Sequence, residues 1–244
     1  MSNKEAPLSY VLRLGDNALI TGQRMIERVA GEPELEEELA NANFALDYIG
    51  QARLFYSYAG ELEGAGRTED DFAFLRDGQE FRNLLLVEQA NGHFGDSIVR
   101  QVLFESFYLL QLQALVAVGD QRLAEIAARA EKEIRYHLRH ASQWLVRLGD
   151  GTEESHERAQ QSLDQYWRFT GEFFEADSFD GSDLEHLQKE WRKQIAAILA
   201  EARLSMPEDQ FMATGGRQGK HSESFGFLIA EMQHMQRSYP GVTW

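Results

Sequence analysis

The chain has 244 residues, four prolines and no cysteine, so it can hold long helices around one well-filled core but can form neither disulfides nor thiolate metal sites. Its 40 acidic and 24 basic residues give a formal net charge of -16, which opposes the binding of nucleic acid. No apolar run reaches the roughly 20 residues that span a bilayer, and the first residues lack the apolar centre of a signal peptide. The sequence therefore predicts a cytoplasmic protein that binds neither nucleic acid nor membrane.

Two long helices are predicted near the start of the chain, over residues 8–30 and 33–62, with Gly31 and Pro33 between them. The second helix carries an apolar stripe at helical spacing, formed by Leu35, Leu39, Ala42, Leu46, Ile49, Arg53 and Tyr56. Further apolar residues lie outside this stripe, namely Phe44, Leu54, Phe55 and Tyr58. The helix is thus apolar on several sides, and we expect it to lie centrally.

A long connection follows these two helices. Residues 64–71 favour an exposed turn, and 72–75 and 83–88 are short apolar segments. Residues 91–96 interrupt the pattern, with Asp96 as the expected N-cap of the third long helix.

The third helix is predicted to run to about Val118, and the fourth to start after the N-cap Asp120 and end at residues 149–151. Short connections within each pair of helices and a long one between the pairs are typical of ferritin-like bundles. Further helices are expected over 155–176 and 182–203, and a last one after the glycine-rich segment 214–221. The sequence therefore predicts an all-α fold, with a ferritin-like four-helix bundle core and additional C-terminal helices, in one domain over residues 1–244.

The four long helices carry one candidate metal-binding carboxylate each: Asp16, Asp47, Glu105 and Glu133. Asp16 precedes Asp47 by nearly the same interval as Glu105 precedes Glu133. One carboxylate per helix is the layout of a di-iron bundle, in which two of the helices carry Glu-x-x-His.

Both histidine positions of this layout are lost, because Gly50 and Tyr136 stand three residues after Asp47 and Glu133. Glycine offers no donor atom, and a phenol with its high pKa is a poor ligand. We therefore expect Asp16, Asp47, Gly50, Glu105, Glu133 and Tyr136 to be a degenerate, metal-free set. Its buried acids would pair with nearby side chains instead, and the candidates are Arg53, Arg100, Lys132 and Arg135.

Several unusual segments resemble the C subunits of phenylacetyl-CoA epoxidase complexes. They are residues 12–17, 46–53, 83–89, 135–139, 214–216, 220–223 and 231–233. The resemblance extends over nearly the whole chain.

This resemblance implies a structural subunit with no catalytic and no cofactor-binding residue of its own, working in aerobic phenylacetate degradation. It implies a catalytic A subunit as partner, whose di-iron centre makes the ring 1,2-epoxide of phenylacetyl-CoA, and it leaves the B subunit open as a second partner. It also implies that FAD, an iron–sulfur cluster and NADPH serve the complex through other subunits.

Two hypotheses follow. In the preferred one, the chain pairs with the catalytic subunit through the surplus apolar surface of the first two helices, at Phe44, Leu54, Phe55 and Tyr58, and self-associates when isolated. The alternative is a divergent ferritin-like di-metal oxidase that is active on its own. Its ligands would be Asp16, Asp47, Glu105, Glu133 and, as a rearranged ligand, His137.

Overall fold

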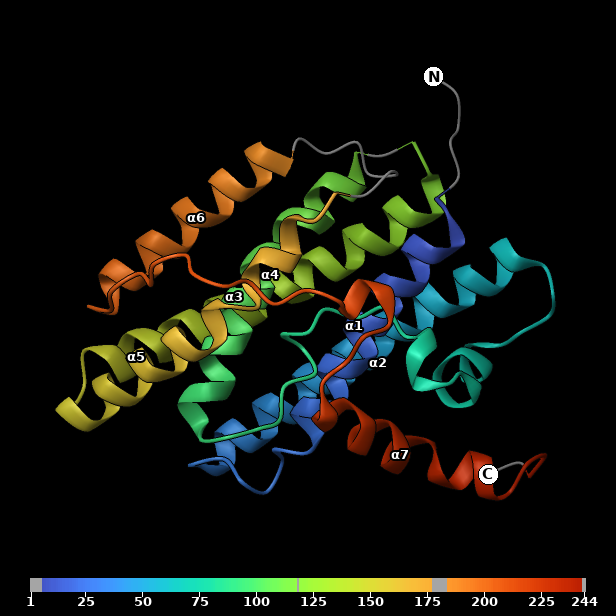
Figure 1. Cartoon of the computed structure of the whole chain (residues 1–244), viewed down its shortest axis with the longest axis horizontal. Helices are drawn as coiled ribbons and strands as arrows, with labels where there is room; N and C mark the ends of the chain where they lie inside the picture. Colours follow the sequence, from blue (N-terminus) through green and yellow to red (C-terminus); the bar gives the residue numbers. More distant parts are fainter. Residues whose placement is uncertain (1–5, 118, 177–183, 243–244) are drawn as a thin grey trace. The chain divides into compact units, whose positions relative to one another are not determined.

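The computed structural model describes residues 6–117, 119–176 and 184–242, and within these ranges the chain is helical without any β-strand (Figure 1). The α-helices are α1 (Leu8–Ile26), α2 (Leu35–Glu63), α3 (Phe94–Val116), α4 (Gln121–Gly149), α5 (Glu153–Trp167), α6 (Leu184–Glu201) and α7 (Glu223–Ser238). Short helices lie between them: η1 (Asp71–Leu75), which is a π-helix, and η2 (Gly78–Glu80), η3 (Thr170–Phe174) and η4 (Gly216–Gln218), which are 3₁₀ helices. The predicted all-α class is confirmed.

The contacts between residues divide the chain into two compact units. Among the described residues, the terminal unit consists of 6–90 and 215–242, and the middle unit of the described part of 91–214. Each unit contains one of the two predicted helix pairs. A single domain and a four-helix bundle built from both pairs stay predictions.

In the terminal unit, α1 is buried on almost every side, because it packs against α2 and the polar residues of its other faces hold the connection between residues 64 and 90. The Asn17 side-chain oxygen accepts a hydrogen bond from the Leu84 backbone N–H at 2.8 Å, and the Arg24 guanidinium donates to the Glu88 carbonyl at 2.7 Å. Backbone groups that enter a core need such partners, since an unpaired one costs free energy. Residues 81–88 of this connection are therefore an internal part of the unit, whereas residues 64–71 are mostly exposed, as predicted.

In the middle unit, α3 and α4 form a hairpin on which α5 and α6 pack. The N-cap predicted for α4 is confirmed, because the Asp120 side chain accepts a hydrogen bond from the Leu123 N–H at 2.9 Å. Aromatic side chains fill the space beside α3. The Phe107 and Phe173 rings stack 4.7 Å apart.

Three predicted helix ends are wrong. The first helix, predicted over 8–30, ends at Ile26. The N-cap of α3 is His93, and Asp96 lies three residues inside the helix, where its carboxylate accepts a hydrogen bond from the His93 N–H at 2.9 Å. The helix predicted over 155–176 stops at Trp167, whose carbonyl accepts a hydrogen bond from the Thr170 hydroxyl at 2.8 Å. Such local side-chain bonds compete with the helical pattern. The ends predicted at Val118 and Ser182 lie outside the described residues.

The buried face of α2 is not the predicted leucine stripe. Phe44, Phe55 and Tyr58 are buried, whereas Leu35, Leu39 and Leu46 keep 66%, 58% and 64% of their surface exposed. Aromatic side chains remove more apolar area from water than leucines do, which explains why the aromatic side of the helix faces inward.

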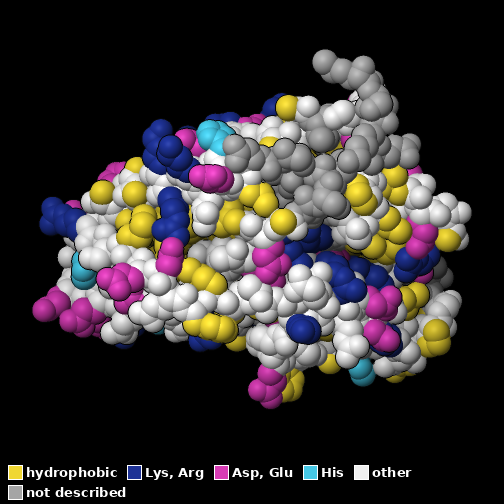
Figure 2. Space-filling model, turned by 45° about the horizontal axis from the view of Figure 1, so that its top comes forward, with side chains coloured by type: hydrophobic (Ala, Val, Ile, Leu, Met, Phe, Trp, Pro, Cys, Tyr) yellow, Lys and Arg dark blue, Asp and Glu magenta, His cyan; other side chains and the backbone are white. Residues whose placement is uncertain are grey.

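Hydrophobic side chains lie in separate patches between acidic and basic ones on the face that Figure 2 shows. In the ranges that the structure describes, no helix combines the length and the apolar character that crossing a membrane requires.

Candidate functional site

Asp16 lies fully buried in the terminal unit, and its carboxylate is bound by protein groups. The Tyr56 hydroxyl donates to Oδ1 at 2.7 Å, and the backbone N–H of Arg82 donates to Oδ2 at 2.8 Å. The Arg76 guanidinium donates to both carboxylate oxygens, with Nη1 3.3 Å from Oδ2 and Nη2 bonded to Oδ1. Gly15 makes room for this arrangement, because a Cβ at that position would meet the Tyr56 ring at 2.6 Å.

These donors occupy the acceptor positions of Asp16. A carboxylate offers about four lone-pair sites, and Tyr56, Arg82 and the two Arg76 nitrogens donate four contacts. A metal ion would have to displace Arg76, whose guanidinium also lies 4.1 Å from the centre of the Phe81 ring. The donor set around Asp16 therefore does not fit a metal.

The charges of this cluster stabilise one another. Burial is the largest single effect and lowers the pKa of Arg76. The negative charge of Asp16 and its hydrogen bond, together with Tyr56 and Glu80, outweigh burial, so the pKa lies above its ordinary value. Burial, with the charge of Asp16 added to it, raises the pKa of the Tyr56 phenol well above its ordinary value. Arg76 thus stays a cation and Tyr56 a neutral donor, which is the combination that balances a buried carboxylate.

The structure does not bring Asp47 and Gly50 to Asp16. Along the antiparallel helix pair, Gly22 is the residue of α1 that lies against Ala45 and Ile49 of α2. Gly22 is six residues beyond Asp16, or about 9 Å of helix rise. Asp47 is half-buried, and a side chain at Gly50 would meet no atom within 4 Å.

In the middle unit, Glu105 and His137 are both fully buried, and Glu105 Oε1 lies 3.9 Å from His137 Nδ1. The expected burial of Glu105 is confirmed. The histidine one residue after the predicted position is the side chain that faces it. Of the two hypothetical ligand sets, only that of the alternative hypothesis includes this histidine.

Glu133 and Tyr136 lie on the outer side of α4. The Arg129 guanidinium is 3.3 Å from Glu133, and Tyr136 keeps 53% of its surface exposed. The buried side chains of this part of α4 include Ile134, His137 and Leu138, so the inward-facing positions come one residue later than the Glu-x-x-His spacing predicted. Of the proposed partners for buried acids, Arg53 is exposed and pairs with Glu69 at 2.6 Å, and Arg135 pairs with Glu131. Among the residues with described positions, no three acidic or histidine side chains are grouped so that they could hold a metal ion.

A second buried polar cluster of the terminal unit was missed. The Glu88 carboxylate is fully buried and lies 2.6 Å from His221 Nδ1, while His221 Nε2 lies 3.1 Å from the Phe81 carbonyl. Glu88 also accepts hydrogen bonds from Asn83 at 2.9 Å and from the Ser222 N–H at 2.6 Å. Glu88 and His221 occur in segments 83–89 and 220–223, but 133 residues separate them in sequence, so no spacing rule could pair them.

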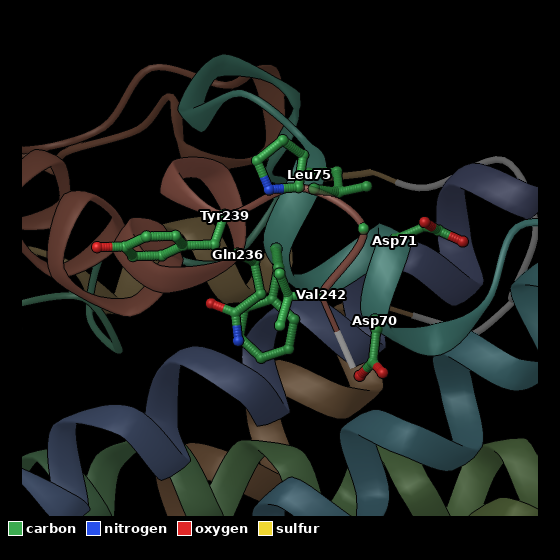
Figure 3. A pocket seen from close by; sticks show the side chains of 9 residues that line it. Asp70, Asp71, Leu75, Gln236, Tyr239 and Val242 are labelled. Atoms are coloured by element: carbon green, nitrogen blue, oxygen red, sulfur yellow. The ribbon is translucent and has the colours of Figure 1, made fainter. Parts of the chain in front are cut away.

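One open hollow of about 390 Å³ lies between η1 and the end of α7 (Figure 3). Asp70, Asp71 and Leu75 line one side, and Gln236 and Tyr239 are among the residues on the other. None of the predicted site residues contributes to this lining.

The family model described as phenylacetic acid catabolic protein matches residues 1–244. The chain belongs to this family. It is 46% identical over 244 residues to the C subunit of 1,2-phenylacetyl-CoA epoxidase from Escherichia coli (strain K12), an alignment that covers 97% of this chain and 98% of the relative. The resemblance found in the sequence is confirmed, and family membership assigns the chain to phenylacetate catabolism.

The Glu105–His137 contact leads to a first prediction. Glu105→Ala is expected to lower the melting temperature of the chain, because it removes one partner of a buried polar contact, which typically costs about 1–3 kcal/mol. The measurement is thermal unfolding followed by circular dichroism. Glu133→Ala on the outer side of the same hairpin is the control and should leave the melting temperature almost unchanged. Equal effects of the two substitutions would contradict this account.

Proposed function

We propose that the chain is a non-catalytic structural subunit of a multicomponent phenylacetyl-CoA 1,2-epoxidase, which pairs with and stabilises the di-iron catalytic A subunit in phenylacetate degradation. The observation that carries the proposal is the hydrogen bonding of the Asp16 carboxylate. Its acceptor positions are occupied by donors from Tyr56, Arg76 and Arg82. Membership of the phenylacetic acid catabolic family and the 46% identity to the C subunit of an epoxidase support it. In this proposal the chain has no catalytic residue, and the di-iron centre, FAD, iron–sulfur cluster and NADPH sites belong to other subunits.

The arrangement supports a structural role through the connection between α2 and α3. The carboxylate of Asp16 binds the backbone N–H of Arg82, and Asn17 binds that of Leu84. Polar side chains of α1, at and next to the expected metal position, thus bind the backbone of the connection between α2 and α3. In this proposal they stabilise the fold of the subunit and take no part in a reaction.

The alternative, a di-metal oxidase active on its own, has one observation in its favour: Glu105 and His137 lie together in the interior of the middle unit. Its other ligands are less well placed, since Asp47 is not level with Asp16 and Glu133 pairs with Arg129.

Metal analysis separates the two proposals. The chain purified after exposure to Fe(II) is expected to hold no stoichiometric iron and to show no di-iron absorption band. Alone it should not oxidise phenylacetyl-CoA, whereas adding it to the catalytic A subunit should raise the activity of that subunit. About two irons per chain, together with substrate oxidation by the chain alone, would establish the oxidase instead.

A further inference from the structure

The exposed leucines of α2 form a regular helical seam. Leu35, Leu39 and Leu46 are mostly exposed, and Ala42 and Ile49, which complete the stripe, are half-buried. Their intervals alternate between four and three residues, which is the spacing of positions that interlock between two packed helices. The core of the terminal unit takes up only the far end of the stripe, where Ile49 lies against Gly22 and Tyr56 binds Asp16. The three leucines lie outside this core, which the aromatic side of α2 fills.

The seam has room for a partner side chain at its C-terminal end. A side chain at Gly50 would meet no atom within 4 Å, so open space lies beside Leu46 and Ile49. In interlocked helices, a side chain of one helix enters a space between four residues of the other. The glycine that stands where a histidine ligand was expected thus leaves a place for a side chain of another helix.

The charges beside the seam restrict the partner. Glu36, Glu37 and Glu38 lie in the first turn of α2, and Asp47 is half-buried near its middle. The one basic residue of α2, Arg53, forms an ion pair with Glu69 at 2.6 Å. A second copy would bring the same acidic residues and another net charge of -16, whereas a helix with basic residues beside its apolar seam would complement them.

We infer that the leucine seam of α2 is the surface that receives a helix of the catalytic A subunit, one with apolar residues at the same spacing and lysine or arginine beside them. This inference rests on the proposed function, because that function supplies the partner. It replaces Phe44, Phe55 and Tyr58, which the sequence suggested for this contact and which are buried in the chain's own core. The half-buried Leu54 lies outside the seam.

The test measures binding of the A subunit to the full-length chain by size-exclusion chromatography and titration calorimetry. The variant Leu39→Glu/Leu46→Glu places two charges in the seam, and since both positions are exposed, its melting temperature should stay unchanged. Its affinity for the A subunit is expected to fall at least ~100-fold, as charges at the centre of an apolar interface prevent close packing. The control Phe227→Glu on α7 changes a residue that is 69% exposed and should bind like the wild type.

The outcomes are distinguishable. If the wild-type chain does not bind the A subunit, the proposed function fails. If the wild type binds and the seam variant binds equally well, the seam is not the contact and only this inference is overturned. Loss of self-association in the seam variant, with unchanged binding of the A subunit, would show that a second copy uses the surface and would also overturn the inference.

Discussion

Replacing Arg76 with methionine is expected to lower the free energy of unfolding by about 3–5 kcal/mol, which is the usual cost of breaking a buried ion pair. Methionine keeps much of the side-chain volume but leaves the Asp16 carboxylate without its countercharge. Tyr56 and the Arg82 N–H would still donate to it, yet two neutral donors do not balance a buried negative charge. Urea denaturation of the isolated chain measures the effect.

A double variant isolates the cause. Asp16→Asn/Arg76→Met removes both charges, so it should be more stable than Arg76→Met alone, although it removes more of the native interactions. Arg53→Met is a matched control, because this arginine pairs with Glu69 at an exposed position of the same unit. If Arg76→Met costs no more than Arg53→Met, other groups balance the charge of Asp16, and a metal ion could take the place of Arg76.

Replacing His221 with alanine is expected to cost about 3 kcal/mol, because the buried Glu88 carboxylate loses its contact with Nδ1 and the Phe81 carbonyl loses that with Nε2. The loss of the ring also removes its stacking on Phe225, whose centre is 4.0 Å away. Hydrogen exchange should show earlier opening of α7 than of α3. His156→Ala is the control, since its ring contacts the Gly149 carbonyl from a half-buried position. Unchanged exchange in α7 would show that other contacts hold this helix.

The helices could be predicted where local signals decide them. Asp120 caps α4 through the N–H three residues later, an interaction that the sequence displays directly. The end of the helix at Trp167 was missed, because the Thr170 hydroxyl bonds to the Trp167 carbonyl only in a conformation that propensity does not reveal.

The buried face of α2 could not be predicted from periodicity alone. Leucines lie on one side and aromatic residues on another, so both sides satisfy a helical repeat. The choice depends on which side fills the space beside α1, and that is a property of the packed unit.

The candidate site was predicted in part. Asp16 and Glu105 were expected in the interior and lie there, but Arg76 was not among the expected partners. Sixty residues separate Asp16 from Arg76, and the connection that carries Arg76 has no regular pattern of its own. On α4, the positions Glu133 and Tyr136 follow from the Glu-x-x-His spacing, whereas the apolar repeat of the same helix contains Ile134 and His137, and these are the residues that are buried.

The terminal unit combines the first and the last part of the sequence, and this sets the order in which the two units can fold during synthesis. Arg24 donates to the Ser224 carbonyl, a contact between groups 200 residues apart. Glu88 of the same unit can make its contact only after His221 has been synthesised. The ribosome releases the residues from Gly215 onward last, so this unit cannot be completed until translation ends, whereas Asn91–Thr214 can fold earlier. Contacts over such long separations also form slowly. A chain that stops short of Gly215 should therefore contain a folded middle unit and an incomplete terminal unit, and such a product is a target for chaperones and proteases.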